Sequence, residues 1–224
     1  LNNDTLINMT TGFSKTAETV AGKLVGGTDS TQFGRPSFVF VDEKKNIFVC
    51  DQWNHRIQKW VPGAKAGITV AGGRGAGKRL SQLNNPTGIF VTADGLLYIA
   101  DTDNDRILVW KEGDTTGTVV AGGNGRGIKP NQLSYPTSVF VDAYGSVYIA
   151  DALNARIQLW IKGSIAGKTV AGGNFAGAGA NQLSNPLGVF VDQRENIYIA
   201  DSQNDRIQRW KLGDIRGTTV AGGK

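Results

Sequence analysis

The sequence predicts an all-β fold, a β-propeller made of four-stranded antiparallel blades. Two observations support this prediction: a unit of 50 residues recurs along the chain without insertion, and each unit holds four short runs of β-branched and aromatic residues separated by turn residues. Such a small unit cannot bury both faces of its sheet alone. Neighbouring units must therefore stack around an axis.

The same residue types return in the same register in every unit. TVAGG or a close variant ends at residues 23, 73, 123, 173 and 223. A proline opens each unit, at Pro36, Pro86, Pro136 and Pro186. A phenylalanine recurs in the first strand, at Phe40, Phe90, Phe140 and Phe190. A tryptophan recurs in the third strand, at Trp60, Trp110, Trp160 and Trp210. No stretch shows a helical period, which excludes a helical solenoid.

The last unit illustrates the expected strands in order. They cover residues 188–192, 196–201, 206–210 and 218–223, and the breaks between them carry the Asn, Asp and Gly that turns require. A glycine-rich loop, for example residues 122–136, connects the fourth strand to the next unit.

The two ends of the chain do not match each other. Residues 1–23 align with the second half of a unit, with Ile7 in register with Ile57. We therefore expect four complete blades in residues 17–224, and residues 1–16 as part of a further blade that contributes two outer strands. A half-blade leaves a sheet edge that can pair with another chain. Either a further unit follows Lys224 in a longer protein, or the ends meet another copy through residues such as Leu6 and Ile7.

An Asp, an Asn and an Arg recur at the turn between the second and third strands. They are Asp51, Asn54, Arg56, Asp101, Asn104, Arg106, Asp151, Asn154, Arg156, Asp201, Asn204 and Arg206. Asp and Asn hydrogen-bond local backbone amides and accept left-handed geometry, so we interpret this motif as a structural turn. We expect each arginine to bridge to a carboxylate or carbonyl of its own or a neighbouring blade.

These motifs resemble the NHL repeat. Asp51, Asn54, His55 and Arg56 spell the D-x-x-N-H-R sequence of that family, and the wider pattern from Pro186 to Trp210 is similar as well. The resemblance covers the chain from residue 17 onward and implies a β-propeller of a binding protein. It also implies two alternatives, because some members bind RNA through a basic face and some NHL-like propellers are metal-dependent lyases or lactonases with His and carboxylates at the central channel.

His55, the only histidine, aligns with Asp105, Ala155 and Asp205. We therefore expect it in a solvent-facing turn without a shared role, and neither a catalytic residue nor a metal site is predicted, since zinc needs three or four converging ligands. Trp53 aligns with Asp103, Leu153 and Gln203, and an unmatched tryptophan on this turn is a candidate interface anchor together with His55.

Four further residues are interpreted structurally. Cys50 aligns with alanines, so we expect a small buried hydrophobic residue that forms no internal disulfide. Phe33 and Phe175, like Tyr135, have no counterpart of their own kind in the connectors, and local loop packing is the plainer interpretation.

Composition limits the partners. The chain has 224 residues with 24 Lys and Arg against 19 Asp and Glu, a net charge of +5, and its cations are scattered. The turn acids Asp103, Asp105 and Asp205 weaken a nucleic-acid interpretation without excluding it. No apolar run reaches the roughly 20 residues needed to span a membrane.

Asn3 and Asn8 each begin an N-x-T sequon, and the chain starts at Leu1 rather than Met. These features favour a secreted glycoprotein or a fragment. The leading hypothesis is an extracellular, non-enzymatic propeller without cofactor that serves as a structural or protein-binding scaffold and self-assembles head to tail. RNA binding is the alternative, and a lyase or lactonase is less supported because the chain offers one histidine.

Overall fold

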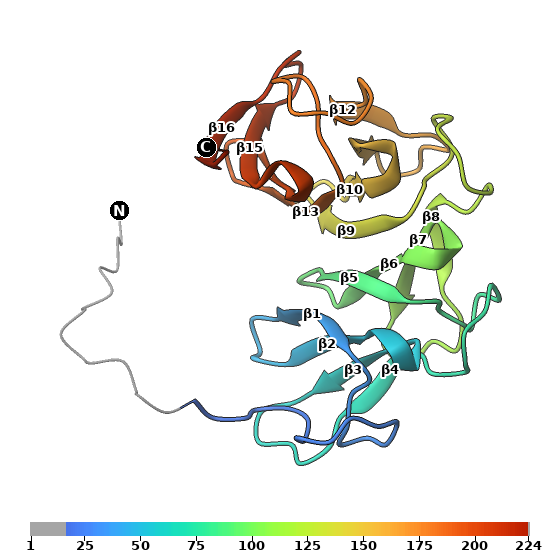
Figure 1. The fold of residues 1–224 in the computed structure, drawn as a ribbon. Coiled ribbons are helices and arrows are strands. Elements are labelled where there is room, and N and C mark those ends of the chain that lie inside the picture. The colour runs from blue at the N-terminus through green and yellow to red at the C-terminus, as the bar shows by residue number, and fades with distance from the viewer. Residues whose placement is uncertain (1–16, 224) are drawn as a thin grey trace, which may run out of the picture.

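The computed structural model describes residues 17–223, which contain four antiparallel sheets of four strands each. Within each sheet the strands pair in chain order, so every blade is a simple meander. The blades follow one another along an arc, from the first at the blue end to the fourth at the red end (Figure 1). The predicted all-β propeller of four-stranded blades is confirmed.

The strands begin and end close to the predicted positions. In the first two blades they are β1 (Pro36–Val41), β2 (Ile47–Asp51), β3 (Arg56–Trp60), β4 (Ile68–Gly72), β5 (Pro86–Val91), β6 (Leu96–Asp101), β7 (Arg106–Lys111) and β8 (Thr118–Gly122). In the last two they are β9 (Pro136–Val141), β10 (Val147–Asp151), β11 (Arg156–Trp160), β12 (Lys168–Gly172), β13 (Pro186–Val191), β14 (Asn196–Asp201), β15 (Arg206–Lys211) and β16 (Thr218–Gly222).

A single 3₁₀ turn separates the second and third strands of each blade. These turns are η1 (Gln52–Asn54), η2 (Thr102–Asn104), η3 (Ala152–Asn154) and η4 (Ser202–Asn204). The residue after each turn has a left-handed backbone, with φ from 49° to 51° at His55, Asp105, Ala155 and Asp205. The reversal places the Asp of the second strand opposite the Arg of the third, as Asp51 opposite Arg56.

The hydrophobic core consists of three clusters, each lying between two successive blades. Between the first two blades, Phe48, Cys50 and Ile57 of one blade pack with Ile89, Ile99 and Trp110 of the next, and equivalent residues fill the other two interfaces. No blade therefore has a core of its own. Each is stabilised by the apolar surface that its neighbours remove from water.

Each connector folds back on itself before it enters the next blade. Leu83, Leu133 and Leu183 are fully buried at the same point of three connectors, and each forms a parallel bridge with a residue earlier in the loop. Phe33 occupies this position in the connector of the first blade and packs against Trp60, with 5.9 Å between ring centroids. It thus replaces the anchoring leucine rather than packing only locally in its loop.

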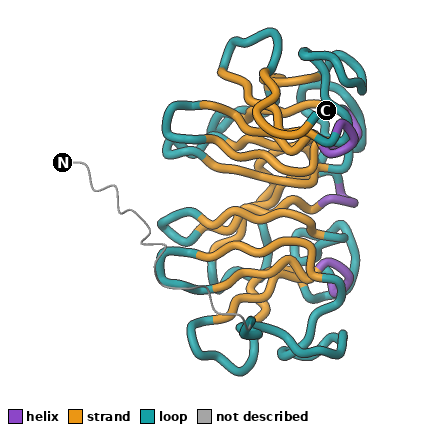
Figure 2. The backbone as a smooth tube through the Cα atoms, turned by 60° about the vertical axis from the view of Figure 1, so that its left-hand side comes forward, coloured by secondary structure: helices purple, strands orange, loops and turns teal. Residues whose placement is uncertain are grey.

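The arc has two distinct faces. The 3₁₀ turns lie on one side of the sheets and the hairpin loops between first and second strands lie on the other, as the purple and teal segments of Figure 2 show. We call the side with the turns and connectors the connector face and the opposite side the hairpin face. Along the inner edge, β1 lies against β5, β5 against β9 and β9 against β13.

The N-terminal half-blade was expected to supply two outer strands. Its first strand and the whole segment 1–16 lie outside the described residues. Residues 17–35 contain no strand, so the expected outer strand at 18–23 is not formed. A strand is stable only when it pairs with a neighbour, and in every complete blade the equivalent strand pairs with the third strand.

Candidate protein-binding surfaces

The recurring Asp, Asn and Arg form a buried clamp. In the first blade, one carboxylate oxygen of Asp51 accepts hydrogen bonds from Arg56 Nε at 2.7 Å and Asn54 Nδ2 at 2.9 Å, and the other accepts from the backbone N–H of Gly34 at 2.6 Å. The other three blades repeat this ion pair at 2.7 Å, as Asp101–Arg106, Asp151–Arg156 and Asp201–Arg206.

The clamp holds the connector that leads into its own blade. The guanidinium of Arg56 donates to the backbone carbonyls of Thr28, Asp29 and Gln32, and Asn54 donates to the carbonyl of Gly27. The Asp side chains are fully buried and their oxygens are engaged within the scaffold. The geometry shows a structural device that holds the connector against its blade.

His55 has a partner that the sequence comparison missed. Its Nδ1 accepts a hydrogen bond from the backbone N–H of Asn85 at 3.1 Å, and Asp105 accepts one in the same way from the N–H of Tyr135 at 2.8 Å. The expectation of a turn residue without a shared role was therefore wrong. Imidazole and carboxylate both supply an acceptor here, whereas Ala155 cannot.

Trp53 lies on the connector face at the first turn and its side chain is 62% exposed. The guanidinium of Arg35 stands over its ring, 5.4 Å from the centroid, an arrangement that holds both side chains in place. At the same position in the third blade, Leu153 is also exposed. The structure thus leaves Trp53 available for contact, as an interface anchor requires.

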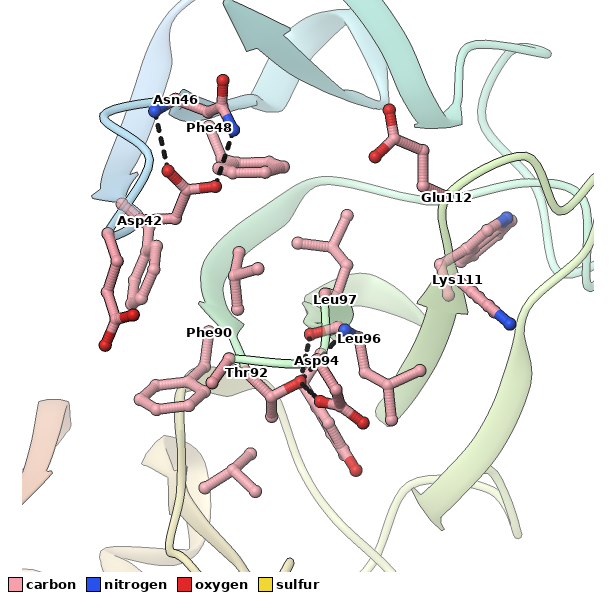
Figure 3. A pocket seen from close by; sticks show the side chains of 18 of the residues that line it. Asp42, Asn46, Phe48, Phe90, Thr92, Asp94, Leu96, Leu97, Lys111 and Glu112 are labelled. Carbon is pink, nitrogen blue, oxygen red and sulfur yellow. Dashed lines mark hydrogen bonds between the residues drawn. The ribbon is translucent and has the colours of Figure 1, made fainter. Parts of the chain in front are cut away.

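A groove of about 950 Å³ opens on the hairpin face across the first three blades. Figure 3 shows Asp42 and Asn46 on one wall and Lys111 and Glu112 on the other, with Phe48 and Phe90 among the lining side chains. Two of the charged groups of the rim, Asp42 and Glu112, have partners within the protein, because Asn46 donates to Asp42 at 2.7 Å and Lys59 pairs with Glu112 at 2.9 Å.

Tyr98 also lines this groove. Burial raises the pKa of its hydroxyl above the usual value, and the carboxylate of Asp94 adds to this effect. The phenol therefore stays protonated at neutral pH and can only donate or accept a hydrogen bond. The groove therefore combines apolar side chains such as Phe48 and Phe90 with a charged rim.

The two outermost blades expose surfaces that are buried elsewhere. Val39 on the outer side of β1 is 57% exposed, whereas its equivalents Ile89 and Val139 are 1% and 4% exposed. On the opposite end, Phe190 of β13 is 57% exposed, although Phe40, Phe90 and Phe140 are each partly covered by the next blade. We call these surfaces the first-blade end face and the fourth-blade end face.

The remaining candidates from the sequence can be placed briefly. Leu6 and Ile7, like the sequon residues Asn3 and Asn8, lie outside the described residues. Cys50 is fully buried in the cluster between the first two blades, and burial raises the pKa of its thiol well above the usual range. Within residues 17–223 no three His, Cys, Asp or Glu side chains gather as a metal site would require.

Membrane attachment by a helix is not seen in the part of the chain that the structure describes, since it holds no apolar helix long enough to cross a bilayer.

Comparison with protein families matches residues 83–110 to the NHL repeat. This stretch runs through β5, β6 and β7 and includes one complete clamp, and the clamp geometry recurs in the other three blades. No curated protein matches.

Several solved structures resemble this chain. A streptogramin B lyase is 12% identical with a TM-score of 0.61, over 87% of this chain and 55% of the other. A structure of a nidogen/laminin complex is 21% identical with a TM-score of 0.64, over 84% of this chain and 64% of the other. An auxiliary nutrient binding protein from Bacteroides thetaiotaomicron is 16% identical with a TM-score of 0.58, over 77% and 46%.

The chain thus spans about half to two thirds of the structures that it resembles. Likeness at this level of identity shows a shared propeller fold.

Proposed function

We propose that this chain, whose residues 83–110 match the NHL repeat, is a non-enzymatic scaffold that binds proteins, including other copies of itself, outside the cell. Its candidate contact surfaces are the two end faces. A non-enzymatic role is supported by the engagement of the clamp carboxylates and of the His55 imidazole in holding the connectors.

The observation that carries the proposal is the contrast between equivalent positions. Val41 is 52% exposed while Val91, Val141 and Val191 are buried, and on the other end Val220 is exposed while Val170 is buried. Each of these side chains contributes about 1.5–3 kcal/mol when it is fully transferred from water. Contiguous apolar surface of this kind marks a site of protein contact.

The internal interfaces support a match between the two end faces. Phe40, Phe90, Phe140 and Phe190 form a row with centroid distances of 5.4, 5.0 and 5.3 Å, and each ring is covered by the next blade except the last. In a second copy, Phe40 and Val39 would supply the missing neighbour. The exposed Asp205 would accept the backbone N–H of Arg35 of that copy, as Asp105 accepts the N–H of Tyr135.

Such a contact joins two different surfaces, so it is heterologous and repeats head to tail. Where an adjoining blade of the same chain covers an end face, the same residues would bind that blade instead. The experiment therefore uses the chain of residues 1–224 itself and measures its mass as a function of concentration.

We expect light scattering to give a mass that rises with protein concentration. The variants Val39→Ser and Phe190→Ser should each weaken this association about tenfold or more, because each removes one buried apolar side chain from the contact. Ile165→Ser is the matched control, since Ile165 is 92% exposed on a loop away from the end faces. A constant monomer mass, or an equal loss in the control, would contradict the proposal.

Deletion of residues 1–16 separates the two versions of self-association. If the end faces carry the contact, the shortened chain associates as before. If Leu6 and Ile7 carry it, association is lost while the end-face variants have no effect.

The extracellular location is supported by the sequons at Asn3 and Asn8. Expression through a secretory pathway should give a protein whose mass falls on treatment with a glycosidase. The double variant Asn3→Gln and Asn8→Gln should secrete without that mass change. An untreated wild-type mass equal to the polypeptide mass would remove this support.

A further inference from the structure

The connector that leads into the second blade carries cations that the scaffold does not use. Arg74, Lys78 and Arg79 are exposed, and they form no ion pair with any carboxylate of residues 17–223. We call residues 74–80 the basic loop. It follows β4 (Ile68–Gly72), and none of its residues lines the groove of the hairpin face.

The repeat itself shows that the fold does not need these charges. In the connector to the fourth blade, the equivalent residues are Asn174, Ala178 and Gly179, and that connector keeps the same parallel bridge and the same clamp contacts. Positions that accept alanine and glycine have no structural demand for a cation. The connector to the third blade carries two cations as well, but Arg126 there pairs with Asp105 at 3.1 Å, which leaves Lys129.

The backbone of the basic loop is fixed although its side chains are exposed. The buried guanidinium of Arg106 donates to the carbonyls of Lys78 at 2.8 Å and Arg79 at 3.1 Å, and Asn104 donates to the carbonyl of Gly77 at 2.8 Å. The N–H of Gly117 donates to the carbonyl of Leu80 at 2.8 Å. A loop held in this way loses little backbone freedom when it binds a partner.

The acids of the second-blade turn form no ion pair with these cations. Asp101 is buried and bound to Arg106, and Asp103 accepts a hydrogen bond from the side chain of Asn85. Leu80, at the end of the loop, exposes 45% of its surface beside Arg79. The loop therefore presents three cations without an ion pair next to an exposed apolar side chain.

We propose that the basic loop binds an acidic segment of a partner protein, with carboxylates on Arg74, Lys78 and Arg79 and an apolar residue on Leu80. Arg guanidinium groups recognise carboxylates through paired hydrogen bonds, and the neighbouring leucine suits a polypeptide. A nucleic-acid site would instead extend as a stripe of unpaired cations over several connectors. In the next connector Arg126 is paired with Asp105, and the connector of residues 174–184 carries no cation.

The test measures the fluorescence anisotropy of labelled poly-L-glutamate with the full chain at low and physiological salt. We expect saturable binding that weakens as salt rises, because exposed charges are screened. The triple variant Arg74→Asn, Lys78→Ala and Arg79→Gly installs the residues of the fourth-blade connector, so it should fold normally. It should lose about tenfold to a hundredfold in affinity, since each exposed ion pair contributes modestly.

The matched control is the triple variant Lys44→Ala, Lys45→Gly and Lys65→Ala, which removes the same charge from the β1–β2 hairpin and the β3–β4 loop. It should bind as tightly as the wild type. Equal losses in both variants would reduce the effect to net charge and overturn the proposal. Tighter binding of poly-U than of poly-L-glutamate would also overturn it and would identify a nucleic-acid site. An absence of binding at low salt would overturn it as well. The end-face variants leave this loop intact, so the two proposals fail independently.

Discussion

Asn85 donates its backbone N–H to Nδ1 of His55, which joins the turn of the first blade to the connector of the second. The same connector starts at His55 as well, because the N–H of Gly73 donates to the His55 carbonyl at 3.0 Å. One residue thus fixes both ends of the connector that carries the basic loop.

The effect of replacing His55 on the free energy of unfolding should depend on whether the new residue can accept a hydrogen bond. We expect His55→Ala to lower the free energy of unfolding by about 1 kcal/mol, the usual contribution of one such bond. His55→Asp should cost less, because Asp105 makes the equivalent bond with the same left-handed backbone. Urea denaturation measures both, and equal losses would show that the acceptor has no role.

Two equivalent glycines should respond differently to a methyl group. A Cβ on Gly88 would lie 2.6 Å from the carbonyl oxygen of Thr137 and 2.9 Å from Cα of Ser138, both in the next blade. A Cβ on Gly188 would meet only Cβ of Ala200, at 3.5 Å. We expect Gly88→Ala to cost about 1–3 kcal/mol by overpacking, and Gly188→Ala to be nearly neutral. Thermal unfolding of the two variants gives the comparison, and similar melting temperatures would argue against close packing of these blades.

Removing a carboxylate of the clamp should lower the free energy of unfolding far more than removing one of a surface ion pair. Asp101→Ala leaves the buried guanidinium of Arg106 without its carboxylate, and we expect a loss of about 3–5 kcal/mol. Glu112→Ala removes the exposed pair with Lys59 and should cost less than about 1 kcal/mol. Denaturant unfolding of both variants tests the difference. If the costs are alike, the clamp is not a stabilising element.

Cys50 should be unreactive in the folded protein. Burial raises the pKa of its thiol well above the usual range, and a thiolate is the reactive form. Reaction with a disulfide reagent should therefore require unfolding and follow the denaturation curve. Rapid labelling in native buffer would show that the interface between the first two blades opens readily.

The same thiol predicts a pH dependence of stability. Its folded pKa lies above the unfolded value of about 8.5, so the folded state keeps a proton that the unfolded state releases, and stability falls as pH rises above that value. The free energy of unfolding then falls by up to about 1.4 kcal/mol per pH unit. Cys50→Ala, which matches Ala100, should lack this component. Identical pH profiles for the two proteins would contradict the assignment.

The blades could be predicted because their determinants are local. Alternating apolar residues and turn residues define each strand, and a fixed period repeats them. For Arg56 the sequence predicted a carboxylate or carbonyl partner but not which residues supply it. Its partners Thr28 and Gln32 lie in the preceding connector, and no local pattern identifies them. Phe33 could have been recognised, because it stands in register with Leu83 and fills the same space.

Other features had a weaker signal or none. His55 was misjudged because Ala155 shares its position, although the acceptor chemistry common to His55 and Asp105 was visible. The exposure of Val39 could not be predicted from residue type, because Ile89 is chemically similar and fully covered. Burial there depends on whether a neighbouring blade is present.

The clamp also decides where one module of this protein can be separated from the next. Arg106 of the second blade binds the carbonyls of Lys78, Arg79 and Gln82, which precede the proline that opens the blade. A segment cut at Pro86 would lose the loop that covers its own arginine, whereas one cut after Gly73 would retain it. Recombination or protein design that exchanges whole repeats should therefore place its junctions after the glycine pairs, such as Gly72 and Gly73. Each exchanged repeat then keeps the connector that covers its own arginine.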